Sequence, residues 1–181
     1  MIKGFEGKKP SFGDYVYVDE QALVLGDVSM GDHVSVWPMA VVRGDVNSIH
    51  VGPRTNIQDN AVLHVTHDGP YTKGGVGLTV GGDVTIGHRV ILHACTVGDR
   101  CLIGMGAIVM DKAVLEDEVY LAAGTLVPPG KHLQGGYLYR GSPVEQVRPI
   151  TDEERAMLKY SAEHYVRLKK RHMVDLPRVP Y

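Results

Sequence analysis

Aliphatic residues recur every six positions along most of the chain. From Val80 the sequence divides into "VGGDVT", "IGHRVI", "VGDRCL", "IGMGAI" and further units of six, with one five-residue unit, "LHACT", among them. The first residue of each unit is aliphatic and the fifth is small or β-branched. The fifth residue of one unit and the first of the next lie two positions apart, so both point to the same side of a strand. The pattern predicts one short strand and one corner per unit.

The same division holds upstream of Val80. Residues 68–79, "DGPYTKGGVGLT", break it and are expected to form an inserted loop. If three units close one triangular coil, residues 1–150 form an all-β parallel solenoid of about six coils. Gly, Asp and Asn fall near the expected corners, where unusual backbone angles are needed. The upstream units begin at Val18, Val24, Met30, Val36, Val42, Val51, Ile57 and Leu63.

The end of the chain has a different pattern. Residues 151–173 lack Gly and Pro, and Thr151 with Glu154 forms a capping box, which predicts the start of a helix. Such a helix is about 30 Å long, close to the height of six coils stacked at about 4.8 Å. Residues 151–181 are therefore expected to form a helix and tail that lie along the solenoid within the same domain. The expected inward residues are Leu158, Ala162, Tyr165 and Leu168.

Charge and composition narrow the class of protein. Lys and Arg number 19 and Asp and Glu 21, for a net charge of -2, and no basic run argues for a nucleic-acid partner. No apolar run approaches the roughly 20 residues of a membrane-spanning helix, and the N-terminus does not look like a signal peptide. The two cysteines, Cys95 and Cys101, do not form a disulfide framework. We therefore expect a cytoplasmic protein with no membrane partner.

The segment "VTIGHRVILHACTVG" holds His88 and His93, five residues apart. This spacing places them on one face of neither a helix nor a strand. Stacking the coils separates their positions. His64 and His93 both follow the first residue of the third unit in their coils, so they should lie one above the other and face outward. Arg43 occupies the same position one coil below.

His88 is expected at the corner before that face, pointing away from the stacked pair. Asp59 occupies the same corner one coil below, and Gln58 precedes it. Two stacked imidazoles can chelate one metal ion, and a third completes a site with an open position. One prism cannot bring His88 round its own corner, whereas three prisms about a threefold axis could set each corner against a neighbour's face. The sequence predicts a shared metal site, with unrelated surface histidines as the alternative.

Five motifs in this order carry a family resemblance over nearly the whole chain: "VWPMAVVRGDV", "TNIQDNAVLHVTH", "TIGHRVILHACTVG", "IGMGAIVMD" and "YRGSPVEQVR". Together they resemble the gamma-class carbonic anhydrases, in particular the bacterial carbonic-anhydrase-like branch. The resemblance implies a left-handed parallel β-helix of hexapeptide repeats and a homotrimer. It implies Zn²⁺, with Fe²⁺ or Co²⁺ as alternatives, held by His64 and His93 of one subunit and His88 of the next. Arg43 and Asp45 would form an ion pair at the trimer interface.

The resemblance also implies a reaction, in which a metal-bound hydroxide hydrates CO₂ to bicarbonate. Gln58, Asp59 and Tyr165 match active-site residues of the family, and Asn56 lies close by. The family archetype has a Glu after the "RGD" motif and a second Glu on an acidic loop that shuttles protons. Here Val46 follows the motif, and residues 65–79 contain no Glu. His67 is the remaining shuttle candidate, so weak or absent activity is expected.

Three other functions fit the same repeats. Many hexapeptide-repeat proteins are acyltransferases that bind coenzyme A between solenoids and use one His as a base. A zinc-dependent thioesterase would use the same metal site as a carbonic anhydrase. A non-catalytic metal-binding trimer would keep the metal without the reaction. Metal content separates the acyltransferase from the other functions.

Overall fold

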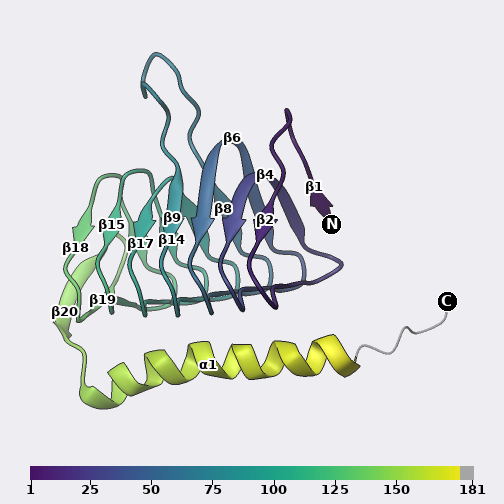
Figure 1. The fold of residues 1–181 in the computed structure, drawn as a ribbon. Coiled ribbons are helices and arrows are strands. Elements are labelled where there is room, and N and C mark those ends of the chain that lie inside the picture. Colours follow the sequence, from purple (N-terminus) through teal and green to yellow (C-terminus); the bar gives the residue numbers. More distant parts are fainter. Residues whose placement is uncertain (176–181) are drawn as a thin grey trace.

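The computed structural model describes residues 1–175, which form a parallel β-solenoid of about eight turns with a single C-terminal helix. Figure 1 shows the coils stacked side by side with the helix along them. The expected solenoid and helix are confirmed. The estimate of six coils is too low, because short strands at both ends extend the faces outside the six-residue pattern. Residues 176–181 of the predicted tail lie outside the described residues.

The strands form three faces, named A, B and C. Two long strands, β4 (Leu23–Met30) and β6 (Val41–Val51), bend at a corner and contribute their first parts to face A and their last parts to face B. Face A otherwise contains β1 (Ile2–Lys3), β8 (Val62–His64), β11 (Ile91–His93), β14 (Ile108–Val109) and β17 (Leu126–Val127). Face B otherwise contains β2 (Ser11–Phe12), β9 (Leu78–Val80), β12 (Thr96–Val97), β15 (Val114–Leu115) and β18 (His132–Leu133).

Face C ends in an antiparallel pair, β19 with β20, whereas its other strands pair in parallel. Its strands are β3 (Tyr17–Val18), β5 (Ser35–Val36), β7 (Asn56–Ile57), β10 (Thr85–Ile86), β13 (Leu102–Ile103), β16 (Tyr120–Leu121), β19 (Tyr137–Arg140) and β20 (Glu145–Pro149).

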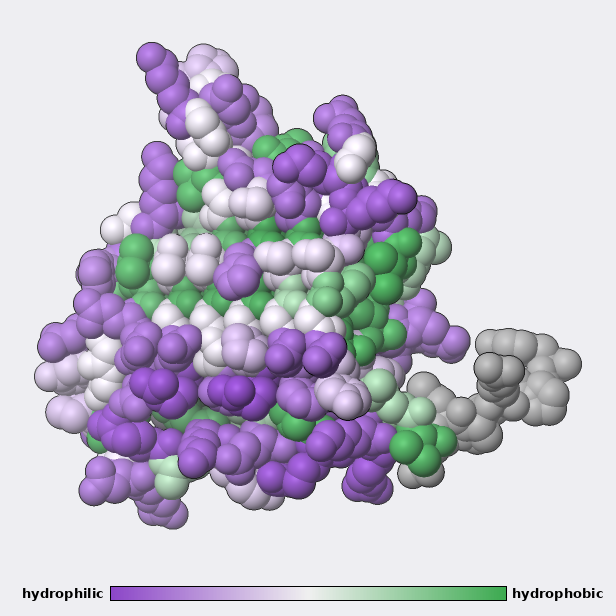
Figure 2. All heavy atoms as spheres, viewed as in Figure 1, coloured by the Kyte–Doolittle hydropathy of each residue, from purple (hydrophilic) through white to green (hydrophobic). Residues whose placement is uncertain are grey.

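The core is built from columns of stacked aliphatic side chains. On face A, Leu63 pairs with Val42 on one side and Leu92 on the other, as the repeat predicts. All three side chains are fully buried. Each apolar side chain thus packs against its equivalents in adjacent coils, and burial of these columns is the main stabilising term of the fold. Figure 2 shows bands of hydrophobic and hydrophilic residues that run along the solenoid.

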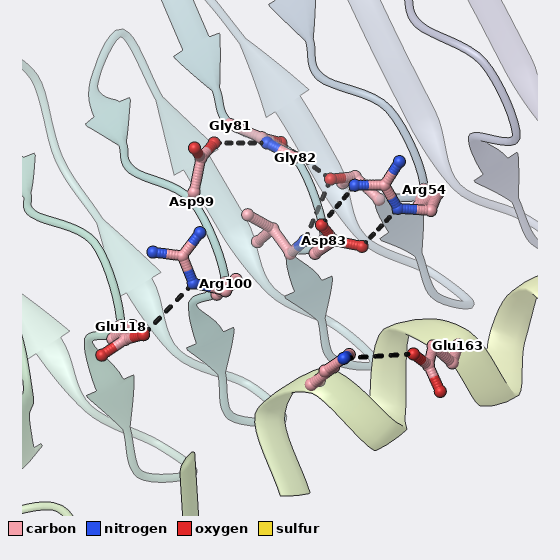
Figure 3. A network of polar contacts seen from close by, with 11 residues as sticks. Arg54, Gly81, Gly82, Asp83, Asp99, Arg100, Glu118 and Glu163 are labelled. Carbon is pink, nitrogen blue, oxygen red and sulfur yellow. Dashed lines mark hydrogen bonds and ion pairs between the residues drawn. The ribbon is translucent and has the colours of Figure 1, made fainter. Parts of the chain in front are cut away.

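Corner residues adopt backbone angles that strands do not. At the corner between faces B and C, four successive coils place Arg54, Asp83, Arg100 and Glu118 at positive φ angles of 53 to 61°. Their side chains form a charged ladder beside the helix (Figure 3), with Arg54 paired to Asp83 at 2.6 Å and Arg100 to Glu118 at 3.2 Å. Arg155 of the helix also pairs with Glu118.

The helix α1 (Asp152–Asp175) covers face C, where it contacts β5, β7 and β10. The capping box is confirmed: Glu154 N donates to Thr151 Oγ1 at 3.1 Å, and Thr151 N donates to Glu154 Oε2 at 2.9 Å. Of the expected inward residues, Leu158 and Ala162 are buried, while Tyr165 and Leu168 are only partly buried.

Lys169 is buried on this helix, although the sequence analysis did not expect it to face inward. Its side chain is fully buried, and its Nζ donates to the backbone carbonyl of Tyr15. The inward stripe therefore includes Lys169, which the sequence analysis did not expect, whereas Leu168 is only partly buried. Helical spacing places Lys169 on this face, because it lies four residues after Tyr165 and seven after Ala162.

A hairpin interrupts the solenoid between β8 and β9. It projects beyond the coils in Figure 1, and its two sides are joined by antiparallel pairing of Thr66 with Val76 and of Gly69 with Thr72. The inserted loop was expected over 68–79, but β9 already begins at Leu78, whose buried side chain belongs to the core. The segment 66–77 is called the hairpin below.

Candidate metal centre

His64 and His93 lie one above the other on face A. They end β8 and β11, which pair in parallel so that His93 is in register with His64. Their ring centroids are 5.2 Å apart, and His64 Nδ1 faces His93 Nε2 at 3.2 Å. The predicted stacking of this pair is confirmed, although its role in metal binding stays a prediction.

A carboxylate holds the outer nitrogen of each ring. Asp45 Oδ1 lies 3.1 Å from His64 Nε2, and Asp111 Oδ1 lies 2.7 Å from His93 Nδ1. Burial opposes the ionisation of both acids, but hydrogen bonds from Arg43 and His64 lower the pKa of Asp45. Hydrogen bonds from Thr66 and His93 likewise lower the pKa of Asp111. Both acids are therefore ionised acceptors, so the neutral form of either ring would carry its proton on the carboxylate side.

The two inner nitrogens then carry lone pairs that face each other. At 3.2 Å this arrangement is repulsive unless a proton or a metal ion lies between His64 and His93. Burial, followed by the positive charge of Arg43, lowers the pKa of His64 and disfavours the protonated ring. Two neutral imidazoles with carboxylate partners form a donor set that suits Zn²⁺, Fe²⁺ or Co²⁺.

Arg43 and Asp45 are already paired within one chain. Arg43 Nη1 lies 2.5 Å from Asp45 Oδ2, while the other oxygen of the same carboxylate accepts from His64. The expected pairing of Arg43 and Asp45 across a trimer interface stays a prediction, and within one chain Asp45 also contacts His64. The glycine between them fits no larger side chain: a Cβ on Gly44 would lie 2.6 Å from the carbonyl oxygen of Asp27.

His88 has the same kind of partner at a different place. It lies in the turn after β10, and its Nδ1 is 2.9 Å from Oδ2 of Asp59, which occupies the equivalent corner one coil below. The Asp59 contact leaves Nε2 of His88 as the nitrogen that could bind a metal. Within residues 1–175, no three His, Cys, Asp or Glu side chains converge on a point that could hold a metal. A single chain therefore does not bring His88 together with His64 and His93.

Gln58 is oriented by a chain of hydrogen bonds that ends on the helix. Its Nε2 donates to Asn56 Oδ1 at 3.1 Å, and Asn56 Nδ2 donates to Thr85 Oγ1 at 3.1 Å. Thr85 Oγ1 lies 2.9 Å from Ser161 Oγ. Asn56 Nδ2 also donates to the carbonyl of Val84, which leaves Asn56 Oδ1 as the acceptor for Gln58. Thr85 Oγ1 accepts from Asn56, and in the contact with Ser161 Oγ either hydroxyl can donate.

A groove of about 370 Å³ runs along face C from this chain of hydrogen bonds. Gln58, Thr85 and His88 line one part of it. The rest of its wall is mainly apolar and consists of Gly87, Leu102, Ile103, Gly104, Met105, Tyr120, Ala122 and Ala123.

The other two predicted site residues are Tyr165 and His67. Tyr165 is partly buried, with its ring edge-on to Trp37 at 5.5 Å, and burial together with the charge of Asp59 raises its pKa. The effect of Asp59 places Tyr165 near the acid that contacts His88. His67 is exposed in the hairpin. Its role as a proton shuttle stays a prediction.

Sequence reasoning did not identify Asp111 or Thr66. Thr66 donates to Asp111 Oδ2, while Asp111 Oδ1 accepts from His93. The stacking of coils could have identified Asp111 from the sequence. Asp111 lies one residue beyond the position equivalent to His93 in the next coil. A carboxylate at that place can reach a ring directly above it.

Comparison with known proteins supports the resemblance. The chain is 52% identical over 173 residues to protein YrdA of Escherichia coli, covering 96% of this chain and 94% of the relative. It is 36% identical to a carbonic anhydrase of Geobacillus kaustophilus, with coverage of 92% and 87%. It is 41% identical to the mitochondrial gamma carbonic anhydrase 2 of Arabidopsis thaliana, covering 91% of this chain and 59% of that protein.

A solved structure agrees with these relatives. A hexapeptide transferase family protein from Anaplasma phagocytophilum superposes with a TM-score of 0.86 at 43% identity, covering 93% of this chain and 96% of that one. No protein-family model matches the chain. Within residues 1–175, the helix is not long and apolar enough to cross a membrane. From the identity and coverage of these relatives, the chain belongs to the gamma carbonic anhydrase-like family of hexapeptide-repeat proteins.

Proposed function

We propose that the protein binds one divalent metal ion per chain between subunits of a homotrimer and hydrates CO₂ to bicarbonate there. One observation carries the proposal: each of the three predicted ligands has a carboxylate on one ring nitrogen and a free second nitrogen. The pairs are Asp45 with His64, Asp59 with His88, and Asp111 with His93. Carboxylate–histidine pairs of this kind fix the tautomer and ring orientation of metal ligands.

The metal would be held by His64 Nδ1 and His93 Nε2 of one chain and by His88 Nε2 of the next. A divalent ion supplies Lewis acidity that lets a water molecule ionise near neutral pH. Gln58 already donates its amide to Asn56, so its carbonyl oxygen remains to accept a hydrogen bond from a reacting molecule. Asp59 holds Nδ1 of His88 and would keep the ring oriented toward the neighbouring chain.

Proton export is the step that this chain supports least. The hairpin lacks the glutamate of the family archetype, and His67 is its exposed imidazole. An exposed imidazole is a chemically suitable group to pass protons to buffer. We therefore propose slow turnover that depends on buffer concentration.

The test combines metal content with CO₂ hydration. The protein is prepared without chelators and without oxygen, because Fe²⁺ is one of the candidate metals. Elemental analysis is expected to give about one metal per chain, and stopped-flow hydration assays are expected to give a low rate that follows metal content. Protein that holds no metal and takes up no Zn²⁺, Fe²⁺ or Co²⁺ would exclude the proposal.

The groove favours a second candidate, a metal-dependent thioesterase. Its volume of about 370 Å³ is far larger than CO₂ requires, and its mainly apolar wall suits an acyl group. The same His88 would serve both reactions. Hydrolysis of a short-chain acyl thioester by metal-loaded protein, lost in His88→Ala, would favour this candidate over CO₂ hydration.

A further inference from the structure

We propose that Thr66 is a positioning residue for the metal site and links the conformation of the hairpin to metal affinity. The proposal rests on the proposed metal site and assigns a role to a residue outside the ligand set. Thr66 connects two parts of the molecule, since its backbone belongs to the hairpin and its hydroxyl reaches the carboxylate that orients His93.

The backbone of Thr66 is held from two directions. Its N donates to Val76 O at 2.9 Å, and Val76 N donates to Thr66 O at 2.9 Å. The side-chain amide of Asn47, in β6, donates to the carbonyls of Thr66 and Gly74 at 3.3 Å each. Asn47 thus joins both sides of the hairpin to the solenoid, and the position of the Thr66 hydroxyl depends on the closed hairpin.

The hydroxyl of Thr66 has one role in this arrangement. Thr66 Oγ1 donates to Oδ2 of Asp111, and Oδ1 of the same carboxyl group lies 2.7 Å from His93 Nδ1. The side chains of Asp111 and His93 are about one-third exposed, at 32% and 35%, so water competes for the carboxylate. The hydroxyl removes the freedom of the carboxylate to rotate away from the ring.

The other carboxylate on this face is held in the same way. Asp45 accepts from His64 with one oxygen and pairs with Arg43 through the other. Each carboxylate is therefore fixed at both oxygens, by a cation in one case and by the hairpin hydroxyl in the other. Arg43 belongs to a strand of the solenoid, whereas Thr66 belongs to the hairpin. The support that Thr66 gives to Asp111 therefore changes when the hairpin changes conformation.

The coupling between metal and hairpin is reciprocal. If the closed hairpin favours metal binding, bound metal stabilises the closed hairpin by the same free energy. Amide hydrogen exchange at Thr66 and Val76, which donate the cross-hairpin hydrogen bonds, should then slow when metal binds. This readout does not depend on catalytic activity.

The first experiment compares four proteins: wild type, Thr66→Val, Thr66→Ser and Thr79→Val. Thr66→Val keeps the side-chain shape without the hydroxyl, and Thr66→Ser keeps the hydroxyl. Thr79→Val is the matched control, since Thr79 is exposed on face B in β9. Zn²⁺ affinity is measured by competition with a chelator. We expect Thr66→Val to bind about 10- to 100-fold more weakly, and Thr66→Ser and Thr79→Val to stay near wild type.

Equal Zn²⁺ affinity in Thr66→Val and wild type would overturn the proposal, as would equal weakening in Thr66→Ser and Thr66→Val. If Thr66→Val does not fold, Asn47→Ala replaces it, because the loss of the hairpin brace should also weaken Zn²⁺ binding. In whichever of these two variants folds, metal binding should slow amide exchange at Val76 less than it does in wild type. Unchanged slowing would contradict the coupling.

One further measurement separates this proposal from the proposed function. In metal-free protein, ¹⁵N shifts of the His93 ring report which nitrogen carries the proton. We expect Nδ1–H in wild type and a mixture of tautomers in Thr66→Val. If wild type binds no metal, the proposed function fails, while the tautomer still decides whether Thr66 positions His93. The same tautomer in both proteins would refute that role.

Discussion

His64 Nδ1 and His93 Nε2 face each other at 3.2 Å although 29 residues separate them in the chain. The register of β8 with β11 brings the rings together, and two carboxylates fix which nitrogens meet. The strand pairing explains why the rings are close. The carboxylates explain why the contact suits a cation.

The first prediction tests the shared site. His64→Ala and His88→Ala, each alone, should lose tight metal binding. When the two are unfolded together in equal amounts and refolded, random assembly gives about three-quarters mixed trimers. One junction in each mixed trimer then joins an intact pair, His64 with His93, to an intact His88. About a quarter of all sites should recover metal, measured by elemental analysis after gel filtration.

Refolding each variant alone is the control and should recover no metal. If all three ligands came from one chain, every chain in the mixture would still lack one of them. The absence of recovered metal in verified mixed trimers would therefore refute the shared site.

A second prediction concerns the support of His88. Asp59→Asn should weaken Zn²⁺ binding about 10- to 100-fold, because the amide is a poorer acceptor for Nδ1–H and holds the ring less firmly. Asp27→Asn is a matched control, since that carboxylate pairs with Lys8 at the surface. Chelator competition measures both. Equal Zn²⁺ affinity in both variants would show that Asp59 does not support the ligand.

Turnover is expected to be limited by proton export. Added imidazole buffer should raise the rate of CO₂ hydration, and His67→Ala should lower the rate in dilute buffer without loss of metal. Stopped-flow measurements at constant ionic strength test both effects. A high rate in dilute buffer that His67→Ala leaves unchanged would mean that another route exports the proton.

The chain of hydrogen bonds under the helix should contribute to stability. Thr85→Val removes the hydroxyl that accepts from Asn56, whose side chain is fully buried. We expect the free energy of unfolding to fall by about 1–3 kcal/mol, because a buried amide loses one of its two acceptors. Thr85→Ser keeps the hydroxyl, so its free energy of unfolding should fall less than that of Thr85→Val. Urea unfolding of the two variants gives the comparison.

Sequence patterns predicted the solenoid well because its unit is local. A six-residue period fixes which side chains point inward, and the phase of successive units fixes register, so the contact of Leu63 with Leu92 followed directly. The same argument placed His64 beside His93. The partner acids were harder to find, since the reach of Asp111 to His93 depends on a side-chain conformation in the next coil. Lys169 was missed because lysine is rarely buried fully.

Lys169 should make stability depend on pH. Burial, followed by the charge of Lys170, lowers the pKa of Lys169 from its ordinary value of 10.5 to about 8. Between these two values the unfolded chain holds a proton that the folded chain has released, so the free energy of unfolding should rise with pH. Lys169→Met should abolish this rise, whereas Lys170→Met, at an exposed position, should retain it.

Urea unfolding from pH 7.5 to 10.5 measures the effect, and the difference between each variant and wild type removes the contribution of other titrating groups. A rise that persists in Lys169→Met would show that another group causes it.

The hairpin between β8 and β9 shows where this architecture can accept new sequence. Within a coil, one added residue would shift every later side chain by one column, exchanging core positions for outward ones. An insertion at a corner leaves the columns in phase, and 66–77 joins β8 to β9 without disturbing the pairing of Val80 with Val51. Variation in length is thus confined to the corners, where it lies close to the predicted metal ligands and leaves the core unchanged.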